Sequence, residues 1–411
     1  MRAEIITTGS ELLTGGVLET NSLFLSEGLL PLGIETAFKT VVGDNEKDME
    51  EAIKLALQRA DVVLITGGLG PTEDDITRKV VSKIVKKRLI LNDEALATIK
   101  AVLFSKGKEY LVVNDRQALI PSGARLLHNP TGIAPGFYLK EEGKLLAVVP
   151  GVPSEARAMF REGLKQALEE HVSGKMFLRR RILRTFGMSE SAVNQAIQDI
   201  MKQGHPAVGL IAKETGVDIR ILVKDVSSER SQALLERTET SLRTKLGDIV
   251  YAVDDQEMEE VVGALLKQRR LKLSVAESCT GGLISGRITN IAGSSEYFER
   301  GAVVYSNLSK TEMLGVPADL IDKHGAVSRD VVEAMASGIR KASGADLGLA
   351  VTGIAGPAGG TKEKPVGLVF FALASAHGVK VKEHIFLGTR DQIRLRSSQM
   401  ALDMVRKHLI G

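Results

Sequence analysis

Apolar runs of strand length alternate along this chain with segments of amphipathic helical pattern. Residues 46–60 place Met49, Ile53 and Ala56 on one helical face, and the uninterrupted apolar run 62–66 follows directly. A short apolar run of this kind is consistent with a buried strand. Repeated along the chain, the alternation predicts an α/β fold with a largely parallel sheet.

The length of the chain predicts more than one domain. Its 411 residues exceed what one hydrophobic core usually serves, so two or three domains are expected. We expect a mostly parallel-sheet domain over residues 1–172, a small α+β connecting domain over 173–254 and an α/β domain over 255–411. Further strands are predicted at 2–7, 145–149, 179–186, 218–223 and 271–276, and helices at 189–201 and 258–267.

Composition and charge exclude several classes of function. The apolar content of 44% with 26% charged residues is that of a globular protein. A net charge of +3, from 54 basic and 51 acidic residues, lacks the basic excess of a dedicated nucleic-acid binder, so nucleic acid is not expected as a partner. The single cysteine, Cys279, rules out an intrachain disulfide and suits a reducing compartment. Without a signal-like N-terminus or an uncharged apolar run of about 18 residues, the protein is expected to be cytoplasmic and free of membrane contact.

One segment in the C-terminal third combines a strand, a turn and several reactive side chains. The predicted strand 271–276 leads into the turn 277–282, which precedes an apolar helical pattern. A helix N-terminus there would present unpaired N–H groups and its positive dipole end to a developing oxyanion. Gly281 and Gly282 would let a substrate approach the backbone, and either Ser278 or Thr280 could attack it. Cys279 is interpreted as a small buried residue rather than the nucleophile.

A lysine is the candidate base for this attack. Lys310 follows a second polar cluster, 305–307, and a desolvated amine has a lowered pKa that suits proton abstraction. Tyr305 would orient the amine or relay the proton. No histidine lies in these clusters or in the third one, 352–357, so a Ser–Lys arrangement fits better than a triad. Taken singly, the turn is typical of a helix cap and Lys310 of a surface lysine; the combination indicates amide hydrolysis.

A second candidate site follows the buried run 62–66. Glycines in the loop 67–75 permit close backbone approach to phosphate, and its acidic residues could hold a divalent cation. The same acidic residues would also suit a helix N-terminus without any ligand. We expect Asp74 and Asp75 to bind the ion, with Glu11 and Glu155 as weaker candidates that could instead cap helices. Loops at 8–11, 129–132, 134–137 and 150–155 are predicted to converge there, since parallel strands place such loops at one sheet edge.

Six segments of the C-terminal third resemble the C-terminal domain of the competence-damage-inducible protein family, CinA. They are residues 276–282, 291–295, 298–301, 305–307, 324–328 and 352–357. That domain is similar to nicotinamide-mononucleotide deamidases, so the resemblance implies hydrolysis of nicotinamide mononucleotide to nicotinic acid mononucleotide and ammonia, without a cofactor. It also implies the catalytic cluster Ser278, Tyr305 and Lys310.

The resemblance further implies that an arginine near the C-terminus serves this site. Arg390 and Arg394 are available, and Arg394 is preferred. Its guanidinium would suit the nucleotide phosphate, since a planar fork matches phosphate oxygens two at a time. With Ser278 and Thr280 left open as nucleophile, we assign Thr280 and Arg394 to the catalytic group. The expected substrate-binding residues are Gly281, Gly282, Asn307, Thr352, Gly353 and Arg390.

The N-terminal loops, together with Asn21 and residues 114–118, resemble the N-terminal domain of the same family, which is similar to molybdopterin-binding domains. The resemblance implies a divalent-metal-dependent pyrophosphatase that cleaves ADP-ribose to AMP and ribose 5-phosphate. The metal's identity is left open. The expected phosphate-binding residues are Gly9, Ser10, Asn21, Gly67, Gly68, Gly70, Gly151 and Ser154.

Two alternatives to this bifunctional hydrolase are kept. The N-terminal half could bind molybdopterin or another phosphorylated ligand without hydrolysing it. The whole chain could be a competence accessory or scaffold on a degenerate deamidase fold, although intact Ser278, Tyr305 and Lys310 argue against degeneration. Residues 184–187 and 217–220 resemble the family's small middle domain, for which we expect a connecting or dimerisation role, and hence a homodimer.

Overall fold

The computed structural model describes residues 1–172, 174 and 176–411, which form two compact units. The first contains Met1–Arg179 and Val223–Leu234, and the second contains Arg180–Leu222 and Leu235–Gly411. The predicted start of the middle domain, residue 173, lies outside the described residues. No helix in the described part of the chain is long and apolar enough to cross a membrane.

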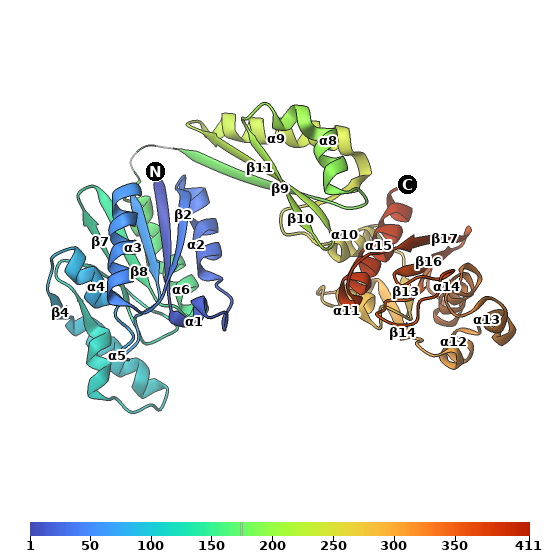
Figure 1. The fold of residues 1–411 in the computed structure, drawn as a ribbon, viewed down its shortest axis with the longest axis horizontal. Coiled ribbons are helices and arrows are strands. Elements are labelled where there is room, and N and C mark those ends of the chain that lie inside the picture. Colours follow the sequence, from blue (N-terminus) through green and yellow to red (C-terminus); the bar gives the residue numbers. More distant parts are fainter. Residues whose placement is uncertain (173, 175) are drawn as a thin grey trace. The chain divides into compact units, whose positions relative to one another are not determined.

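The N-terminal domain is built on a six-stranded sheet in which four adjacent strands are parallel (Figure 1). The two strands at one edge run antiparallel to their neighbours, so the sheet is mixed. The predicted strand 62–66 is present with these bounds and is buried throughout. In spatial order the strands are β2 (Glu35–Val42), β1 (Arg2–Thr8), β3 (Val62–Thr66), β8 (Lys144–Val149), β7 (Gly136–Glu141) and β6 (Arg125–Leu127).

Helices cover both faces of this sheet. Successive residues of a strand point to opposite faces, so the buried strands present apolar side chains on both sides. Ile5 belongs to one hydrophobic cluster and Ile6 to the other. The helices are α1 (Ser10–Leu13), α2 (Asn21–Leu29), α3 (Glu46–Arg59), α4 (Thr77–Ile84), α5 (Asp93–Ser105), α6 (Pro153–Met159) and α7 (Lys165–Glu169). Short helical turns η1 (Leu30–Leu32), η2 (Val112–Ala118) and η3 (Phe160–Leu164) and the strand pair β4 (Leu89–Leu91) and β5 (Leu119–Pro121) complete the domain.

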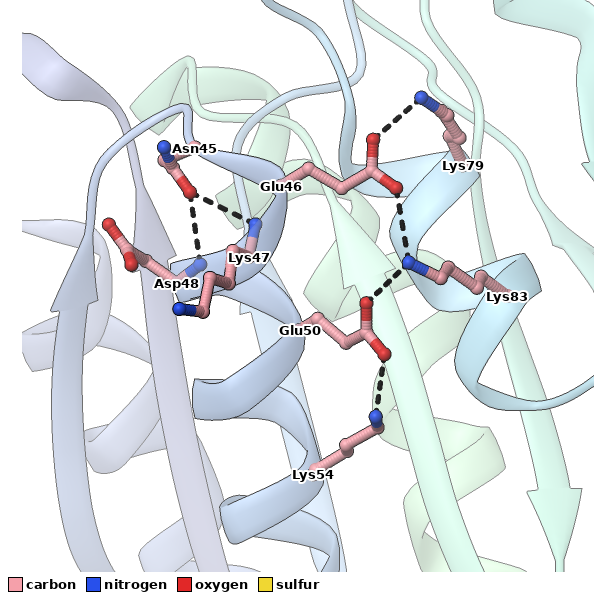
Figure 2. Close-up of polar contacts among 8 residues, drawn as sticks. All are labelled: Asn45, Glu46, Lys47, Asp48, Glu50, Lys54, Lys79 and Lys83. Atoms are coloured by element: carbon pink, nitrogen blue, oxygen red, sulfur yellow. Dashed lines mark hydrogen bonds and ion pairs between the residues drawn. The ribbon is translucent and has the colours of Figure 1, made fainter.

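An ion-pair network joins α3 to α4 (Figure 2). Glu46 contacts Lys79 at 2.6 Å and Lys83 at 3.3 Å, and Glu50 contacts Lys83 at 2.6 Å and Lys54 at 2.5 Å. Hydrogen bonds from the ammonium groups of Lys54 and Lys83 lower the pKa of Glu50 to about 2. Since α4 directly follows the glycine-rich loop after β3, the network helps to fix one end of that loop.

A four-stranded sheet forms the middle of the chain, with α8 and α9 on the same side of it (Figure 1). The predicted strands 179–186 and 218–223 and helix 189–201 are present with shifted ends, while β10, α9 and β12 were not predicted. The elements are β9 (Phe177–Thr185), α8 (Glu190–Met201), β10 (Ala207–Lys213), β11 (Gly216–Asp225), α9 (Ser228–Leu246), η4 (Gly247–Ile249) and β12 (Val250–Val253).

The C-terminal domain has a five-stranded sheet whose first three strands are parallel and whose last two form an antiparallel extension. In spatial order these are β14 (Phe298–Val303), β13 (Leu273–Glu277), β15 (Leu347–Gly353), β16 (Leu368–Ser375) and β17 (Gly378–Ile385). One face packs on α10 (Met258–Arg269), α11 (Leu283–Thr289) and α15 (Arg390–Ile410). The other packs on α12 (Asn307–Leu314), α13 (Ala318–His324) and α14 (Arg329–Ser343). The short turn η5 (Ser294–Glu296) precedes β14.

Candidate active site and phosphate-binding cavity

The turn after β13 is organised by a buried carboxylate. Glu277 is fully buried and accepts hydrogen bonds from the N–H groups of Gly282 at 3.1 Å, Ile284 at 3.0 Å and Ser285 at 2.8 Å, and from the Ser285 hydroxyl at 2.7 Å. The prediction that these helix N-terminal donors are unpaired is therefore wrong. A buried carboxylate needs several donors, and the start of α11 supplies them.

Ser278 and Lys310 come together at the end of the same strand. The Lys310 Nζ lies 3.3 Å from the Ser278 Oγ, although 31 residues separate them in the chain. Lys310 is 1% exposed and its Nζ also lies near the carbonyl oxygens of Val304 at 2.9 Å, Tyr305 at 3.2 Å and Ser306 at 3.4 Å. Burial lowers the pKa of Lys310. This pair has the geometry of a hydroxyl nucleophile and an amine base.

The other two reactive residues of the turn are less suited to attack. Thr280 is 0% exposed, and its Oγ1 has no hydrogen-bond partner among the described residues. Burial raises the pKa of the Cys279 thiol to about 12, which leaves the sulfur protonated near neutral pH. The backbone N–H groups of Cys279 and Thr280 interact with the Cys279 sulfur and donate to no oxygen of the described residues, unlike those of the following helix turn.

Tyr305 reaches the lysine through its backbone rather than its ring. The Tyr305 carbonyl oxygen faces Lys310. The residue as a whole is 63% exposed, and its hydroxyl accepts a 3.3 Å hydrogen bond from Arg390. Arg390 also donates to the Gly356 carbonyl at 2.8 Å. The Tyr305 phenol contacts Arg390 and not the Lys310 amine, so the predicted orienting of the amine or proton relay by this side chain stays a prediction. Asn307 is exposed at the first position of α12.

Two arginines of α15 lie beside this turn. Arg394 donates to the Thr280 carbonyl at 2.9 Å, and its Nη2 would lie 3.6 Å from a Cβ added at Gly281, whose φ is +59°. Arg390 stands one helical turn earlier. Both predicted arginines therefore lie near the candidate site: Arg390 contacts Tyr305, and Arg394 contacts the turn 277–282.

The remaining predicted substrate-binding residues have structural roles in the strands and loops around the site. Thr352 is fully buried and donates to the Ala326 carbonyl at 2.9 Å. A Cβ added at Gly353 would lie 2.7 Å from the Leu368 carbonyl oxygen, so this glycine allows the close approach of β16 to β15. Gly282 has φ of +91° at the N-cap of α11.

The N-terminal domain holds a cavity of about 650 Å³ at the loops that follow its strands. The predicted convergence of loops is confirmed, because residues from 8–11, 129–132, 134–137 and 150–155 contribute to one lining together with the loop 67–75. Predicted site residues in this lining are Gly9, Glu11, Gly67, Gly68, Gly70, Asp74, Asp75, Gly151 and Glu155.

The acidic residues of this cavity differ in what they already bind. The Asp75 carboxylate accepts hydrogen bonds from Gly70 N–H at 2.7 Å, Thr72 N–H at 2.9 Å and the Thr72 hydroxyl at 2.6 Å. Glu155 accepts a 2.7 Å hydrogen bond from Asn129. Asp75 therefore holds the glycine-rich loop together by hydrogen bonds within the loop. The Asp74 carboxylate makes no side-chain hydrogen bond to the described residues.

The donor set nevertheless fits a hard divalent cation. The cavity lining offers carboxylate and carbonyl oxygens, the ligands that Mg²⁺ prefers, and such an ion commonly uses one or two carboxylates together with substrate phosphate. Over the described residues, no group of three or more His, Cys, Asp or Glu side chains is arranged to hold a metal by itself. An ion here would depend on the phosphates of the substrate.

Three predicted phosphate-binding residues do not line the cavity. The Asn21 Nδ2 donates to Thr66 Oγ1 at 2.9 Å and to the Gly151 carbonyl at 2.8 Å, so Asn21 braces two of the loops. Ser10 exchanges hydrogen bonds with Asp44, its N–H donating at 2.8 Å and its Oγ accepting at 3.1 Å. Ser154 is exposed in the first turn of α6.

Sequence reasoning missed three charged residues of the lining, Asp44, Lys106 and Lys108. The two lysines follow α5 and flank Gly107, in a segment whose pattern is that of an ordinary exposed helix end. The Lys106 Nζ donates to the Thr131 carbonyl at 3.1 Å, which turns it toward the cavity loops. Only the three-dimensional fold brings these cations to the same cavity as the glycine-rich loop.

Each domain also matches a described family of sequences. Residues 4–170 match a molybdopterin binding domain, residues 180–252 the KH domain of damage-inducible protein CinA, and residues 255–409 the CinA C-terminal domain. The fold and these matches define a three-part α/β protein with a molybdopterin-binding-like domain at its N-terminus.

Similarity over the whole length then gives the family: the chain belongs to CinA, the competence-damage inducible proteins. A competence-damage inducible protein of Caldicellulosiruptor bescii is 43% identical over 411 residues, covering 100% of both chains. Another, of Caldanaerobacter subterraneus subsp. tengcongensis, is 42% identical over 411 residues, covering 100% of this chain and 99% of that one. A crystal structure of CinA from Thermoplasma acidophilum is 33% identical, with a TM-score of 0.38, covering 41% of this chain and 97% of that one.

Proposed function

We propose that the C-terminal domain is a Ser–Lys amidohydrolase that converts nicotinamide mononucleotide to nicotinic acid mononucleotide and ammonia. The observation that carries the proposal is the 3.3 Å approach of Lys310 Nζ to Ser278 Oγ within a buried site. The deamidase-like resemblance of this domain supplies the substrate. Ser278 is chosen over Thr280 because the amine contacts the serine hydroxyl, while the threonine side chain is fully buried.

The reaction runs in two halves on these side chains. Lys310 accepts the Ser278 hydroxyl proton as the Oγ attacks the carboxamide carbon, and the tetrahedral adduct collapses with the proton delivered to the leaving nitrogen as ammonia. Water then attacks the Ser278 ester, again giving a proton to Lys310, and that proton returns to Oγ as the acid leaves. The protein's own groups suffice for both halves, so the domain is proposed to work without a cofactor.

Neighbouring groups support binding and charge stabilisation. The N–H groups of Cys279 and Thr280, which donate to no described oxygen, are proposed to stabilise the oxyanion in place of the donors held by Glu277. Arg394 and Arg390 are proposed to bind the nucleotide phosphate, since a guanidinium fork matches phosphate oxygens two at a time. Gly281 lets the substrate approach this part of the backbone.

The test is ammonia release from nicotinamide mononucleotide by the purified full chain in the presence of a chelator. Ser278→Ala and Lys310→Ala should each lose activity by about 10²-fold or more, as expected for loss of a nucleophile or general base. Thr280→Ser, which keeps a hydroxyl and removes only a buried methyl group, should retain most of it. A wild-type protein without turnover, or a fully active Ser278→Ala variant, contradicts the proposal.

For the N-terminal domain we propose metal-dependent hydrolysis of ADP-ribose to AMP and ribose 5-phosphate. Support comes from the 650 Å³ cavity, whose glycines, lysines and carboxylates suit a diphosphate with an associated cation. The ion, when bound, would neutralise charge on the phosphate oxygens. Asp74 and Glu11 would hold it, Asp75 would keep the loop closed, and Lys106 and Lys108 would bind phosphate.

A binding module without hydrolysis is the second candidate for this domain, favoured by its match to a molybdopterin binding domain. Tight ligand binding with no turnover under any divalent metal would favour the module over the pyrophosphatase. A homodimer remains our proposal for the assembly. Nucleic acid is not proposed as a partner: residues 180–252 match a KH domain but contain no Gly-x-x-Gly sequence, the loop with which such domains clamp a nucleic-acid backbone.

A further inference from the structure

The β10–β11 hairpin of the middle domain touches the helix that carries the two arginines of the candidate active site. Lys213 pairs with Gly216, so Glu214 lies at the tip of a two-residue turn. One Glu214 carboxylate oxygen accepts a 2.8 Å hydrogen bond from Gln392 Nε2, and the other lies 3.0 Å from Arg396 Nη2. Hairpin and helix belong to the same compact unit.

Both helix partners of Glu214 hold the start of α15. Gln392 closes a capping box, because its Oε1 accepts from Thr389 N–H at 2.8 Å while Thr389 caps the helix. Arg396 Nη1 donates to the Leu387 carbonyl at 2.6 Å, in the segment that leads into the helix. Glu214 therefore binds the two side chains that fix where α15 begins and how the chain enters it.

Helix geometry places these contacts opposite the candidate active site. Gln392 and Arg396 are four residues apart and share one face, and Arg390 and Arg394 share another. The two pairs are offset by two residues, or roughly 200° around the axis. The first turns of α15 thus lie between the hairpin tip on one side and the catalytic turn, through the Arg394 to Thr280 contact, on the other.

The hairpin is also linked to the C-terminal domain close to its turn, through Arg184 of β9. Asp218 of β11 contacts Lys213 at 2.7 Å and the buried Arg184 at 3.6 Å. Arg184 in turn contacts Glu257, the N-cap of α10, at 3.2 Å. This second set of contacts limits the movement of the hairpin tip relative to α15.

We propose that Glu214 is a positioning residue for the deamidase site, through which the middle domain sets the placement of Arg390 and Arg394. The inference rests on the proposed function of that site. It assigns the middle domain a role in substrate affinity, since the two arginines are proposed to bind phosphate, whereas Ser278 and Lys310 are held by other elements.

The experiment compares the full-length protein with Glu214→Ala and Glu214→Gln in ammonia release from nicotinamide mononucleotide. Because the pair is partly exposed, KM should rise about three- to fivefold for Glu214→Ala while kcat changes less than about twofold. Glu214→Gln should show a smaller rise.

Glu383→Ala, at an exposed glutamate of the edge strand β17, is the matched control and should leave KM unchanged. Hydrogen exchange of amides 392–398 gives a readout independent of turnover, and Glu214→Ala should speed it. Wild-type KM and unchanged exchange in Glu214→Ala would overturn the inference while leaving the deamidase intact. If the wild-type protein releases no ammonia, the proposed function fails, and exchange alone decides whether Glu214 positions α15.

Discussion

At the scale of single residues, the proposed deamidase chemistry depends on the protonation of one buried amine, that of Lys310. A neutral amine has two N–H donors and one lone pair. Lys310 Nζ lies within hydrogen-bond distance of the carbonyl oxygens of Val304, Tyr305 and Ser306 and of Ser278 Oγ. In the neutral form proposed for catalysis, its N–H groups would donate to carbonyl oxygens and its lone pair would accept the proton of the Ser278 hydroxyl. Burial favours this neutral form, because it disfavours the charged ammonium.

A pH dependence follows from the lowered pKa of Lys310. The base is active only when neutral, so kcat for ammonia release should increase with pH through the pKa of Lys310 and then level off. Since burial lowers that pKa from its ordinary value of 10.5, the plateau should begin at a lower pH than for an exposed lysine. The measurement is a kcat profile between pH 5 and 10.

Lys310→Arg is the matched variant, because arginine keeps the positive charge and stays protonated at every pH of the profile. It should lose about 10²- to 10⁴-fold in kcat. Lys323→Arg, an exposed lysine of α13, should behave as wild type. A pH-independent kcat in the wild-type protein would contradict Lys310 as the base.

The contacts of single residues could be predicted where a side chain makes them, but not where the backbone does. The meeting of Ser278 with Lys310 was expected from the sequence, because the reactivity predicted for them belongs to their side chains. The contribution of Tyr305 was not, since its carbonyl rather than its phenol meets Lys310. Asp75 was assigned to a metal, but an acidic residue near a glycine-rich loop gives the same sequence pattern when it closes that loop by hydrogen bonds.

At the scale of elements, Glu277 links the end of β13 to the start of α11. Its carboxylate replaces water as the acceptor for the first N–H groups of the helix, and it does so in a buried position. The neighbouring Ser278 is therefore held by a strand on one side and a capped helix on the other. Strand and helix were predictable from their patterns, but the acceptor was not, because the sequence does not show which way Glu277 points.

Glu277→Gln should destabilise the C-terminal domain by roughly 3 kcal/mol, because an amide accepts through one oxygen only and leaves buried N–H donors unpaired. The loss should appear as faster hydrogen exchange across α11 and β13 and as lower ammonia release. Glu299→Gln, an exposed glutamate of β14, is the control and should cause neither change. Unchanged exchange in Glu277→Gln would show that the carboxylate is not required to cap the helix.

The α3–α4 network predicts an acid-sensitive contact near the N-terminal cavity. Glu50 has its pKa lowered from 4.5 to about 2, so it favours the folded state above pH 4.5, and this contribution is lost as pH falls toward 2. Glu50→Gln should therefore speed amide exchange in α4 relative to wild type at pH 6. The difference should narrow when both proteins are compared at pH 3, and a constant difference would contradict the assignment.

At the scale of the whole molecule, the two candidate sites lie in different compact units and use different chemistry. The alternation of strands and helices and the convergence of loops could be predicted, because hydrophobic periodicity specifies elements locally, whereas β10 and the antiparallel edge strands of the N-terminal sheet were not. The cavity's lysines and the Glu214 contact could not, since they depend on which surfaces meet after folding. Neither proposed mechanism takes a residue from the other domain's site, so each activity should respond to its own substitutions.

This separation can be tested in one preparation of the full chain with both substrates. A chelator should abolish AMP formation from ADP-ribose, with recovery on adding a divalent metal, while ammonia release from nicotinamide mononucleotide continues. Asp74→Asn should reduce only the first activity, by about 10²-fold if its carboxylate holds the ion, and Ser278→Ala only the second. Loss of ammonia release on chelation would instead mean that the deamidase site depends on a metal, against a mechanism carried by Ser278 and Lys310 alone.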